Sequence, residues 1–183
     1  MKTIKDRSQK RWDRYFYNIC KAVSGKSSCL SRKIGAILVR DKSIISSGFN
    51  GPPRNIPHCG HERFMEDQVI YRELQSVMKS TNAKTVGSTC PRKLLPDYVS
   101  GKRMELCTAK HAEENAVSNA ARVGVITYGA TLYIDSIIPC HRCFGSLINA
   151  GIKEIVVDEK RYYDQQTKFL RDNSDIKIRE FNL

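Results

Sequence analysis

The sequence predicts a three-layer α/β/α fold, with a central mixed sheet of about five strands covered by helices. Short β-rich runs alternate with stretches of helical periodicity over most of the chain. The 183 residues, 40% of them hydrophobic, suffice for one core of ordinary size. The sequence contains no internal repeat and no low-complexity linker. These observations predict a single domain spanning 1–183.

The expected elements follow from periodicity and turn residues. Aromatic and aliphatic residues recur at helical spacing over Arg11–Val23. Two β-rich runs, Ile34–Val39 and Ser43–Phe49, predict a hairpin. The remaining elements, in chain order, are a helix near Glu62–Lys79, a helix at His111–Arg122, a strand at Ala130–Ile138, a helix at Cys140–Ala150, a strand at Lys153–Val157, a helix near Asp164–Asp172 and a strand at Asp175–Arg179.

The segment 60–106 has the weakest periodicity, and we expect it to be a variable insertion with little core of its own. No apolar run approaches the roughly 20 residues of a membrane helix. The stretch Met1–Arg14 is polar and basic and lacks the apolar run of a secretory signal. We therefore expect a cytoplasmic protein without a membrane partner, in the cytoplasm of the host cell if the source is viral.

The formal net charge is +12, from 31 basic and 19 acidic residues. Most of the excess lies in residues 1–33. Such an excess serves nucleic acid, a phosphorylated small molecule or solubility alone. No basic stripe interleaved with aromatic residues marks a strand-binding channel, so the charge by itself is a weak indication of a nucleic-acid partner.

The seven cysteines are many for a reducing compartment. Disulfides are disfavoured there, and an odd number does not close a disulfide framework. Clustered cysteines are then interpreted first as metal ligands or reactive thiols. Cys20 is the exception, because it lies within the first predicted helix, where a small core residue is expected.

The most informative motif joins His111-Ala112-Glu113 to the later run PCHRC at 139–143. One imidazole and two thiolates, from His111, Cys140 and Cys143, form a zinc-ligand set that leaves the fourth tetrahedral position open. Each half begins a predicted helix, whose N-terminal dipole favours thiolate forms. A zinc held in this way lowers the pKa of water toward neutrality, which suits hydrolysis. The alternative is a closed structural site completed by His141.

Glu113 decides between these alternatives, because a closed structural site would leave it without a role. It lies two residues after the histidine ligand, on the same helical turn but rotated away from the metal. The pattern H-x-E…P-C-x-x-C is that of zinc-dependent nucleobase deaminases. In such a reaction Glu113 can accept a proton from the attacking water and deliver it to the ring nitrogen of the base and to the leaving ammonia.

The chain resembles the deoxycytidylate (dCMP) deaminases of the cytidine deaminase-like superfamily. The resemblance covers about Cys29 to Val157, and the HAE and PCxxC motifs are shared by the whole superfamily. The further segments that carry it are SRKIGA at 31–36, GFNGPP at 48–53, PHC at 57–59, CPR at 90–92, HAEENA at 111–116 and GIKEI at 151–155.

This resemblance implies hydrolysis of dCMP to dUMP with release of ammonia, which supplies dUMP for thymidylate synthesis. It also implies a homo-oligomer, often a hexamer, activated by dCTP with Mg²⁺ and inhibited by dTTP. The residues implied to contact the substrate are Asn50, at the sugar, with Ala112, Arg122 and Arg32; those implied for the effector are Asn50, Arg54 and Arg122. For Arg122 the alternative is a cation at a helix C-terminus, and for Arg32 and Arg54 a solvated surface charge.

A second, structural zinc is expected from the remaining cysteines. Some relatives have such a zinc, with ligands at the places of Cys29 and Cys59. Cys90 and Cys107 are two further cysteines at loops or element boundaries, and four thiolates form a closed tetrahedral site. His58 or His61 could replace one of them, and scattered reduced thiols are the alternative. Such a zinc would hold the segment 60–106 in place.

Two rival functions remain. A deaminase acting on tRNA or single-stranded nucleic acid is favoured only by the basic N-terminal region, and a catalytically inactive nucleotide-binding zinc module conflicts with the intact Glu113. The chain departs from the resemblance in one spacing. In relatives the first cysteine lies six positions after the strand tyrosine, whereas Cys140 lies seven positions after Tyr133. This difference concerns the floor of the base pocket.

Overall fold

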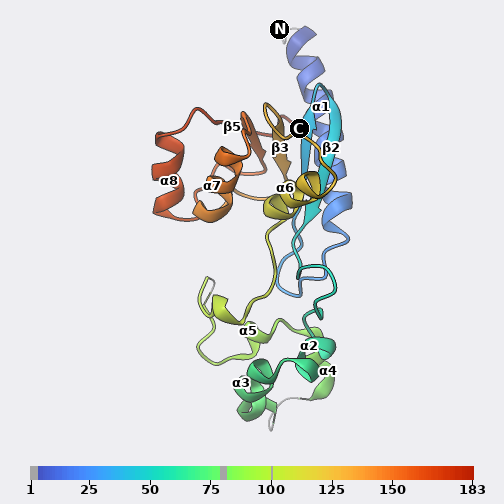
Figure 1. Ribbon diagram of the computed structural model, residues 1–183, viewed down its shortest axis with the longest axis vertical. Coiled ribbons are helices and arrows are strands. Elements are labelled where there is room, and N and C mark those ends of the chain that lie inside the picture. The colour runs from blue at the N-terminus through green and yellow to red at the C-terminus, as the bar shows by residue number, and fades with distance from the viewer. Residues whose placement is uncertain (1–3, 79–81, 100) are drawn as a thin grey trace. The chain divides into compact units, whose positions relative to one another are not determined.

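The computed structural model describes residues 4–78, 82–99 and 101–183 (Figure 1). The chain forms two compact units. The first contains the residues through Ser27, then Ile34–Asn50 and His111–Leu183. The second contains Ser28–Lys33 and Gly51–Lys110, so the predicted insertion 60–106 lies wholly within it. The expectation of a single domain over 1–183 stays a prediction.

In the described residues of the first unit, five strands form one mixed sheet in the order β2-β1-β3-β4-β5. The central strand β3 is antiparallel to β1 and parallel to β4. This confirms the predicted mixed sheet. The strands are β1 (Gly35–Arg40), β2 (Ser43–Phe49), β3 (Thr131–Ile134), β4 (Glu154–Val157) and β5 (Lys177–Glu180).

The helices of this unit agree closely with the sequence prediction. The predicted helix at Arg11–Val23 extends toward the N-terminus through a polar stretch whose Lys, Arg and Gln residues favour helix. Two metal-ligand candidates and Asp164 lie at N-cap positions, one residue before the helices they were predicted to begin. The helices are α1 (Ile4–Ser24), α6 (Ala112–Arg122), α7 (His141–Asn149) and α8 (Gln165–Asp172).

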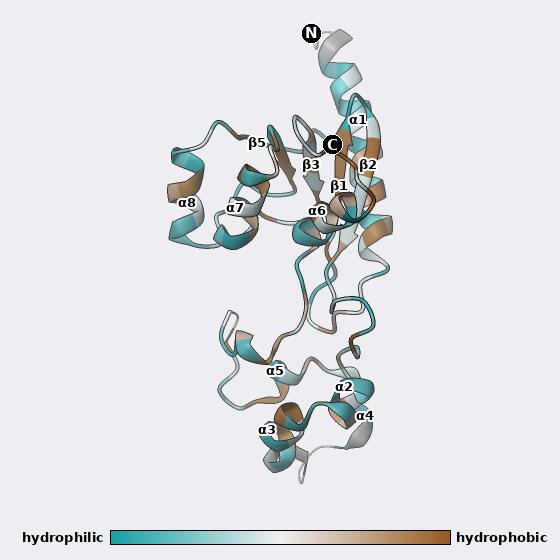
Figure 2. Cartoon of the chain, in the orientation of Figure 1, coloured by the Kyte–Doolittle hydropathy of each residue, from teal (hydrophilic) through white to brown (hydrophobic). Residues whose placement is uncertain are grey.

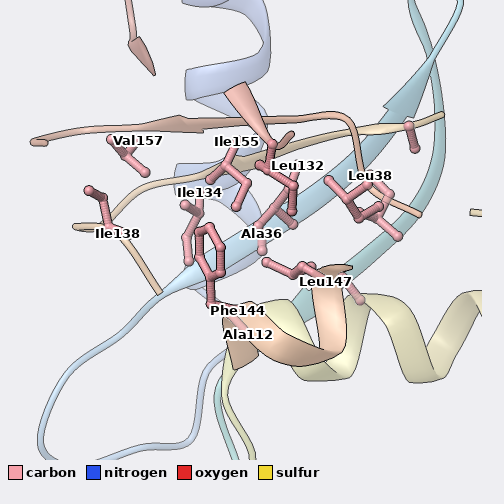
Figure 3. Close-up of a cluster of buried hydrophobic side chains, with 14 of the residues drawn as sticks. Ala36, Leu38, Ala112, Leu132, Ile134, Ile138, Phe144, Leu147, Ile155 and Val157 are labelled. Atoms are coloured by element: carbon pink, nitrogen blue, oxygen red, sulfur yellow. The ribbon is translucent and has the colours of Figure 1, made fainter. Parts of the chain in front are cut away.

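Helices cover both faces of the sheet, which produces the predicted three layers. Side chains of β1 alternate between the faces: Ile37 packs with Phe16 of α1, and Leu38 with Leu147 of α7. Figure 3 shows the hydrophobic cluster that contains Leu38 and Leu147, in which Phe144 and Leu147 of α7 face the sheet. Cys20 is fully buried in the α1 layer, as predicted for a small core residue.

The second unit contains short helices, which the sequence did not resolve. The predicted helix near Glu62–Lys79 is broken at Asp67, whose carboxylate accepts hydrogen bonds from the amides of Val69 and Ile70; Lys79 lies outside the described residues. Ile70, Leu74, Leu95 and Leu106 form a small core, with Phe64 and Leu94 packed against it. The elements of this unit are α2 (His61–Glu66), α3 (Gln68–Met78), α4 (Ala83–Ser88), α5 (Pro91–Leu94) and the 3-10 turn η1 (Met104–Leu106).

The distribution of hydrophobic residues in the first unit agrees with its layers of sheet and helices. In Figure 2 the hydrophobic colour lies on the strand β1, and teal covers much of α7 and α8. None of the helices in the described residues has the length and apolarity that crossing a bilayer requires.

Candidate active site

The site is built on the N-terminal ends of two helices. His111 is the N-cap of α6 and Cys140 is the N-cap of α7. Neither side chain makes the usual capping hydrogen bond to its own helix. Their backbone carbonyls nevertheless begin the helices, since they accept from the amides of Asn115 (2.9 Å) and Phe144 (2.8 Å). Both side chains are therefore available at the positive ends of helix dipoles.

The structure brings together the three predicted catalytic ligands. His111 Nδ1 lies 3.6 Å from Cys140 Sγ and 3.4 Å from Cys143 Sγ. The ligand atoms of all three lie within 4.8 Å of one another, and in the described part of the chain they are the one group of three so placed. Nitrogen and sulfur ligands of one tetrahedral zinc lie about 3.5 Å apart, from bond lengths of about 2.0 and 2.3 Å. The residues therefore fit a zinc ion.

Glu113 lies beside this group without belonging to it. Its Oε1 is 3.8 Å from His111 Nδ1, and the residue is only 4% exposed. Burial raises the pKa of Glu113, against the opposing effect of the His111 imidazole. A carboxylate with a raised pKa at the edge of a metal site is suited to accept and return a proton near neutral pH.

The two thiols have different proton affinities when no metal holds them. The hydrogen bond from Cys143 lowers the pKa of Cys140 to about 4, although burial opposes this. The same hydrogen bond, together with burial, raises the pKa of Cys143. The hydrogen bond with Cys140 also raises the pKa of His111.

Asn50, the predicted sugar contact, is buried at the end of β2 in the first unit. Its side-chain Oδ1 accepts from the amide of Ile34 (2.8 Å) and from the Ser27 hydroxyl (2.8 Å). Ser27 also lies 2.6 Å from the Asn50 carbonyl oxygen. These bonds fix the orientation of the carboxamide. Ser27 was not predictable as a partner of Asn50, because no sequence pattern relates positions 27 and 50.

The other predicted nucleotide contacts are more dispersed. Ala112 is fully buried, in the first turn of α6. Arg122 ends α6, about 16 Å of helix rise from His111. Arg32 and Arg54 belong to the second unit. All four contacts stay predictions.

The extra residue before Pro139 is accommodated by a pairing of two chain segments. Ile137 forms an isolated parallel bridge with Glu159, and the amide of Ile138 donates to the Arg161 carbonyl (3.2 Å). The side chain of Ile138 is buried in the main core. The additional residue therefore lies in a segment that runs beside 158–161.

The four cysteines of the expected second zinc all lie in the second unit. None of the seven cysteines forms a disulfide in the described part of the chain. Burial raises the pKa of Cys59, and the thiols of Cys90 and Cys107 add to this, so these three lie within electrostatic reach of one another. In the described residues no three of the four have sulfurs within 4.8 Å of one another. The structure gathers them in one unit but does not close a site.

Comparison with curated proteins gives the same family repeatedly. The chain is 28% identical to the deoxycytidylate deaminase of Saccharomyces cerevisiae over 171 residues, 93% of this chain but only 45% of the yeast protein. It is 32% identical to the deoxycytidylate deaminase of Mycobacterium phage D29, over 81% of this chain and 95% of that protein. The chain thus spans about half the length of the yeast relative and almost all of the phage relative.

The fold is that of solved deaminases. The dCMP deaminase of cyanophage S-TIM5, in complex with dCMP and dUMP, superposes with a TM-score of 0.60 at 20% identity, over 92% of this chain and 95% of that chain. The family described as the cytidine and deoxycytidylate deaminase zinc-binding region matches residues 10–159. That match includes both halves of the His111, Cys140 and Cys143 group. The chain therefore belongs to the cytidine and deoxycytidylate deaminase zinc-binding family.

Proposed function

We propose that this protein hydrolytically deaminates dCMP to dUMP and releases ammonia. The observation that carries the proposal is the buried Glu113 beside the group formed by His111, Cys140 and Cys143, in a chain of this zinc-binding family. A histidine and two cysteines leave one tetrahedral position for the reaction, as a catalytic rather than structural zinc requires.

The zinc, when bound, supplies a Lewis acid that makes water nucleophilic near neutral pH. Glu113 orients the attacking water and takes one of its protons. The water oxygen forms a bond to C4 of the cytosine ring, and the ring nitrogen N3 receives the proton. Glu113 then moves the second proton to the amino group, the C4–N bond breaks, and ammonia leaves as the C4 carbonyl of uracil forms.

The mononucleotide is proposed as substrate because of the relatives. Those from yeast and from the mycobacterial phage are both named deoxycytidylate deaminase. The GFNGPP loop at 48–53 also resembles that branch of the family. Asn50, held by Ile34 and Ser27, is proposed to contact the sugar, and Ala112 and Arg32 to line the substrate site.

Regulation and assembly are part of the same proposal. We propose activation by dCTP with Mg²⁺ and inhibition by dTTP, with Asn50, Arg54 and Arg122 as effector contacts, in a homo-oligomer that is a hexamer. A nucleotide substrate and seven free thiols suit a reducing cytoplasm.

A second, structural zinc is proposed in the second unit, held by Cys29, Cys59, Cys90 and Cys107. A zinc with four thiolates carries a net charge of −2, and the buried Arg63 lies with its Nη1 4.0 Å from Cys59 Sγ, where it would offset that charge. Metal binding would draw the four sulfurs closer together and add stability to a unit whose apolar core is small.

The second zinc is tested by counting metal per chain. Wild-type protein is expected to contain two zinc ions and the double variant Cys90→Ser/Cys107→Ser one, whereas Cys20→Ser, in the core of the first unit, should keep both. One zinc ion per chain in wild type, removed by Cys140→Ser, would show that the second site does not exist.

The proposed reaction is tested by ammonia release from the purified protein. dCMP, CMP, deoxycytidine and a cytosine-containing single strand are offered in parallel, with and without dCTP and Mg²⁺. A preference for dCMP supports the proposal, and stimulation by dCTP supports the effector site. Turnover of the strand alone would make the protein a nucleic-acid deaminase. Tight dCMP binding without ammonia would make it an inactive nucleotide-binding module.

A further inference from the structure

Cys140 occupies a position that leaves the first turn of α7 without its usual cap. The residue is the N-cap of α7, but its side chain makes no capping hydrogen bond. The first backbone amides of a helix have no partner within the helix and require one from elsewhere. The amide of His141, the first of this turn, therefore needs an acceptor other than the Cys140 sulfur.

Asp164, the N-cap of α8, supplies an acceptor to this first turn from another helix. Its Oδ2 accepts from the backbone amide of His141, the first residue of α7, at 3.2 Å, and lies 3.0 Å from His141 Nδ1. Its Oδ1 accepts from the amide of Thr167 at 2.7 Å and thereby caps α8. One carboxylate thus serves the N-termini of both helices. Burial opposes its ionisation, but the hydrogen bonds from His141 and Thr167 hold the pKa of Asp164 at about 2.

Thr167 holds the other side of the ligand. It is 0% exposed, and its hydroxyl lies 3.2 Å from the Pro139 carbonyl oxygen and 3.0 Å from Asp164 Oδ1. Pro139 precedes Cys140, and His141 follows it. The peptide groups on both sides of Cys140 are therefore hydrogen-bonded to the first turn of α8. This connects the ligand to an element that contributes no ligand of its own.

We propose that Asp164 and Thr167 are positioning residues that fix the backbone at Cys140 and thereby set how tightly the site retains its metal. The proposal rests on zinc binding at this site, as the proposed function does. Groups that orient ligands from outside the coordination sphere change metal affinity or activity by roughly 10–100-fold when removed. Neither residue contacts the reacting atoms, so their effect is exerted through the ligand.

Asp164→Asn separates the two capping roles. Asparagine is as good an N-cap as aspartate, so α8 keeps its cap, but an amide group now faces the His141 amide, where an acceptor is needed. Thr167→Val removes the hydroxyl at nearly constant shape, and Thr167→Ser restores it. Asn82→Ala removes the side-chain cap of α4, which accepts from the amide of Thr85, and serves as a control for the cost of losing a cap elsewhere.

The measurement is the rate of zinc release to a chromogenic chelator from the full-length protein. The kinetic phase of zinc release that is absent from Cys140→Ser identifies the zinc held by His111, Cys140 and Cys143. Asp164→Asn and Thr167→Val are expected to release this zinc roughly 10–100-fold faster than wild type, with Thr167→Ser and Asn82→Ala at the wild-type rate. With dCMP, kcat should fall at full zinc loading while KM changes little.

Wild-type release rates in both Asp164→Asn and Thr167→Val would overturn the proposal, as would a wild-type protein that binds no zinc through Cys140. An equal increase in the rate of zinc release in Asn82→Ala would also overturn the proposal, because it would show that loss of any helix cap loosens the zinc through lower overall stability. Zinc release is measured without substrate. A protein that does not deaminate dCMP would therefore contradict the proposed reaction without contradicting the positioning role of Asp164 and Thr167.

Discussion

Gly48 of β2 lies directly against Ala112 in the first turn of α6. A Cβ atom at position 48 would be 2.3 Å from the Ala112 carbonyl oxygen and 2.3 Å from the Ala116 amide nitrogen. Both are backbone atoms, which cannot move aside as a flexible side chain would. The glycine therefore permits the close approach of the helix that carries His111 and Glu113.

Hydrogen bonds hold α6 at this distance. Asn115 and Asn119, one turn apart, donate from Nδ2 to the carbonyl oxygens of Phe49 and Ser47, each at 2.8 Å. The Ser46 hydroxyl donates to the Ala116 carbonyl oxygen at 2.7 Å. Since β2 is an edge strand in the described sheet, the helix also satisfies carbonyls that an exposed edge would leave to solvent or to another chain.

Gly48→Ala is expected to destabilise the protein by about 1–3 kcal/mol, the usual cost of overpacking, and to weaken zinc retention by displacing α6. Gly145→Ala is the matched control: the residue lies in helix α7, and nothing would meet its Cβ within 4 Å. Because alanine is the better helix former, that variant should gain roughly 0.5–1 kcal/mol. Denaturant unfolding measures both, and equal stability of the two variants would contradict the close approach.

The sequence predicted those features of the site that depend on local spacing. His111 and Glu113 lie two residues apart and Cys140 and Cys143 three, so each pair is carried by a single helix turn. The central strands β1, β3 and β4 were equally predictable, because each is a short run of mostly buried residues between turn signals. The strand pattern therefore predicted the mixed sheet correctly, and the motifs predicted the three side chains that the structure brings together.

The supports of the site were not predicted, because they join residues far apart in sequence. Asp164 is 23 positions from His141, and no pattern at either position indicates the other. Asp164 and Thr167 do have the spacing of an N-cap, but this spacing predicts only the start of α8. Likewise, the tight approach over Gly48 depends on the depth at which α6 packs, which periodicity does not specify.

Glu113→Gln is expected to lower kcat for dCMP by roughly 10²–10⁴-fold, because an amide cannot accept the proton of the attacking water. Zinc content should be unchanged, since Glu113 lies beside the ligands rather than among them. Glu114→Gln, at the adjacent position, is the control for a local change of charge. Full turnover by Glu113→Gln would contradict the assigned proton transfer.

Removal of the metal is expected to destabilise the protein, because a ligand that binds only the folded state adds to its stability. At a free zinc concentration 100 times the Kd the gain is about 2.7 kcal/mol. Thermal unfolding with and without a chelator measures the difference. Cys140→Ser should unfold at a lower temperature than wild type and respond less to the chelator. An unchanged melting temperature in wild type after complete removal of zinc would contradict the metal's contribution.

Asp13→Ala is expected to cost about 3–5 kcal/mol, the usual penalty for breaking a buried ion pair. Asp13 is 0% exposed and accepts from Arg179 Nη1 (2.6 Å) and Nη2 (3.0 Å), which ties α1 to β5. It also accepts from Gln9 Nε2 (2.8 Å) and the Asn182 amide (2.9 Å). Asp172→Ala breaks an exposed pair with Lys168 and should cost at most about 1 kcal/mol. Comparable losses in the two variants would contradict the role of burial.

Tyr133 is expected to make stability decline at alkaline pH. Burial raises its pKa to about 12 from the ordinary 10, although the neighbouring Arg179 opposes this. Its neutral form is therefore favoured in the folded state, and this contribution is fully present below pH 10. As the pH rises from 10 toward 12 the unfolded chain loses the phenol proton first, so the contribution is progressively lost.

Tyr133→Phe should remove that part of the pH dependence, because phenylalanine has no proton to lose. Tyr128→Phe is the control, since Tyr128 is 78% exposed. Urea unfolding at a series of pH values between 9 and 12 measures the slope for each protein. The wild type and Tyr128→Phe should lose stability more steeply above pH 10 than Tyr133→Phe does. Identical slopes in all three would mean that the Tyr133 phenol ionises as readily in the folded protein as in the unfolded chain.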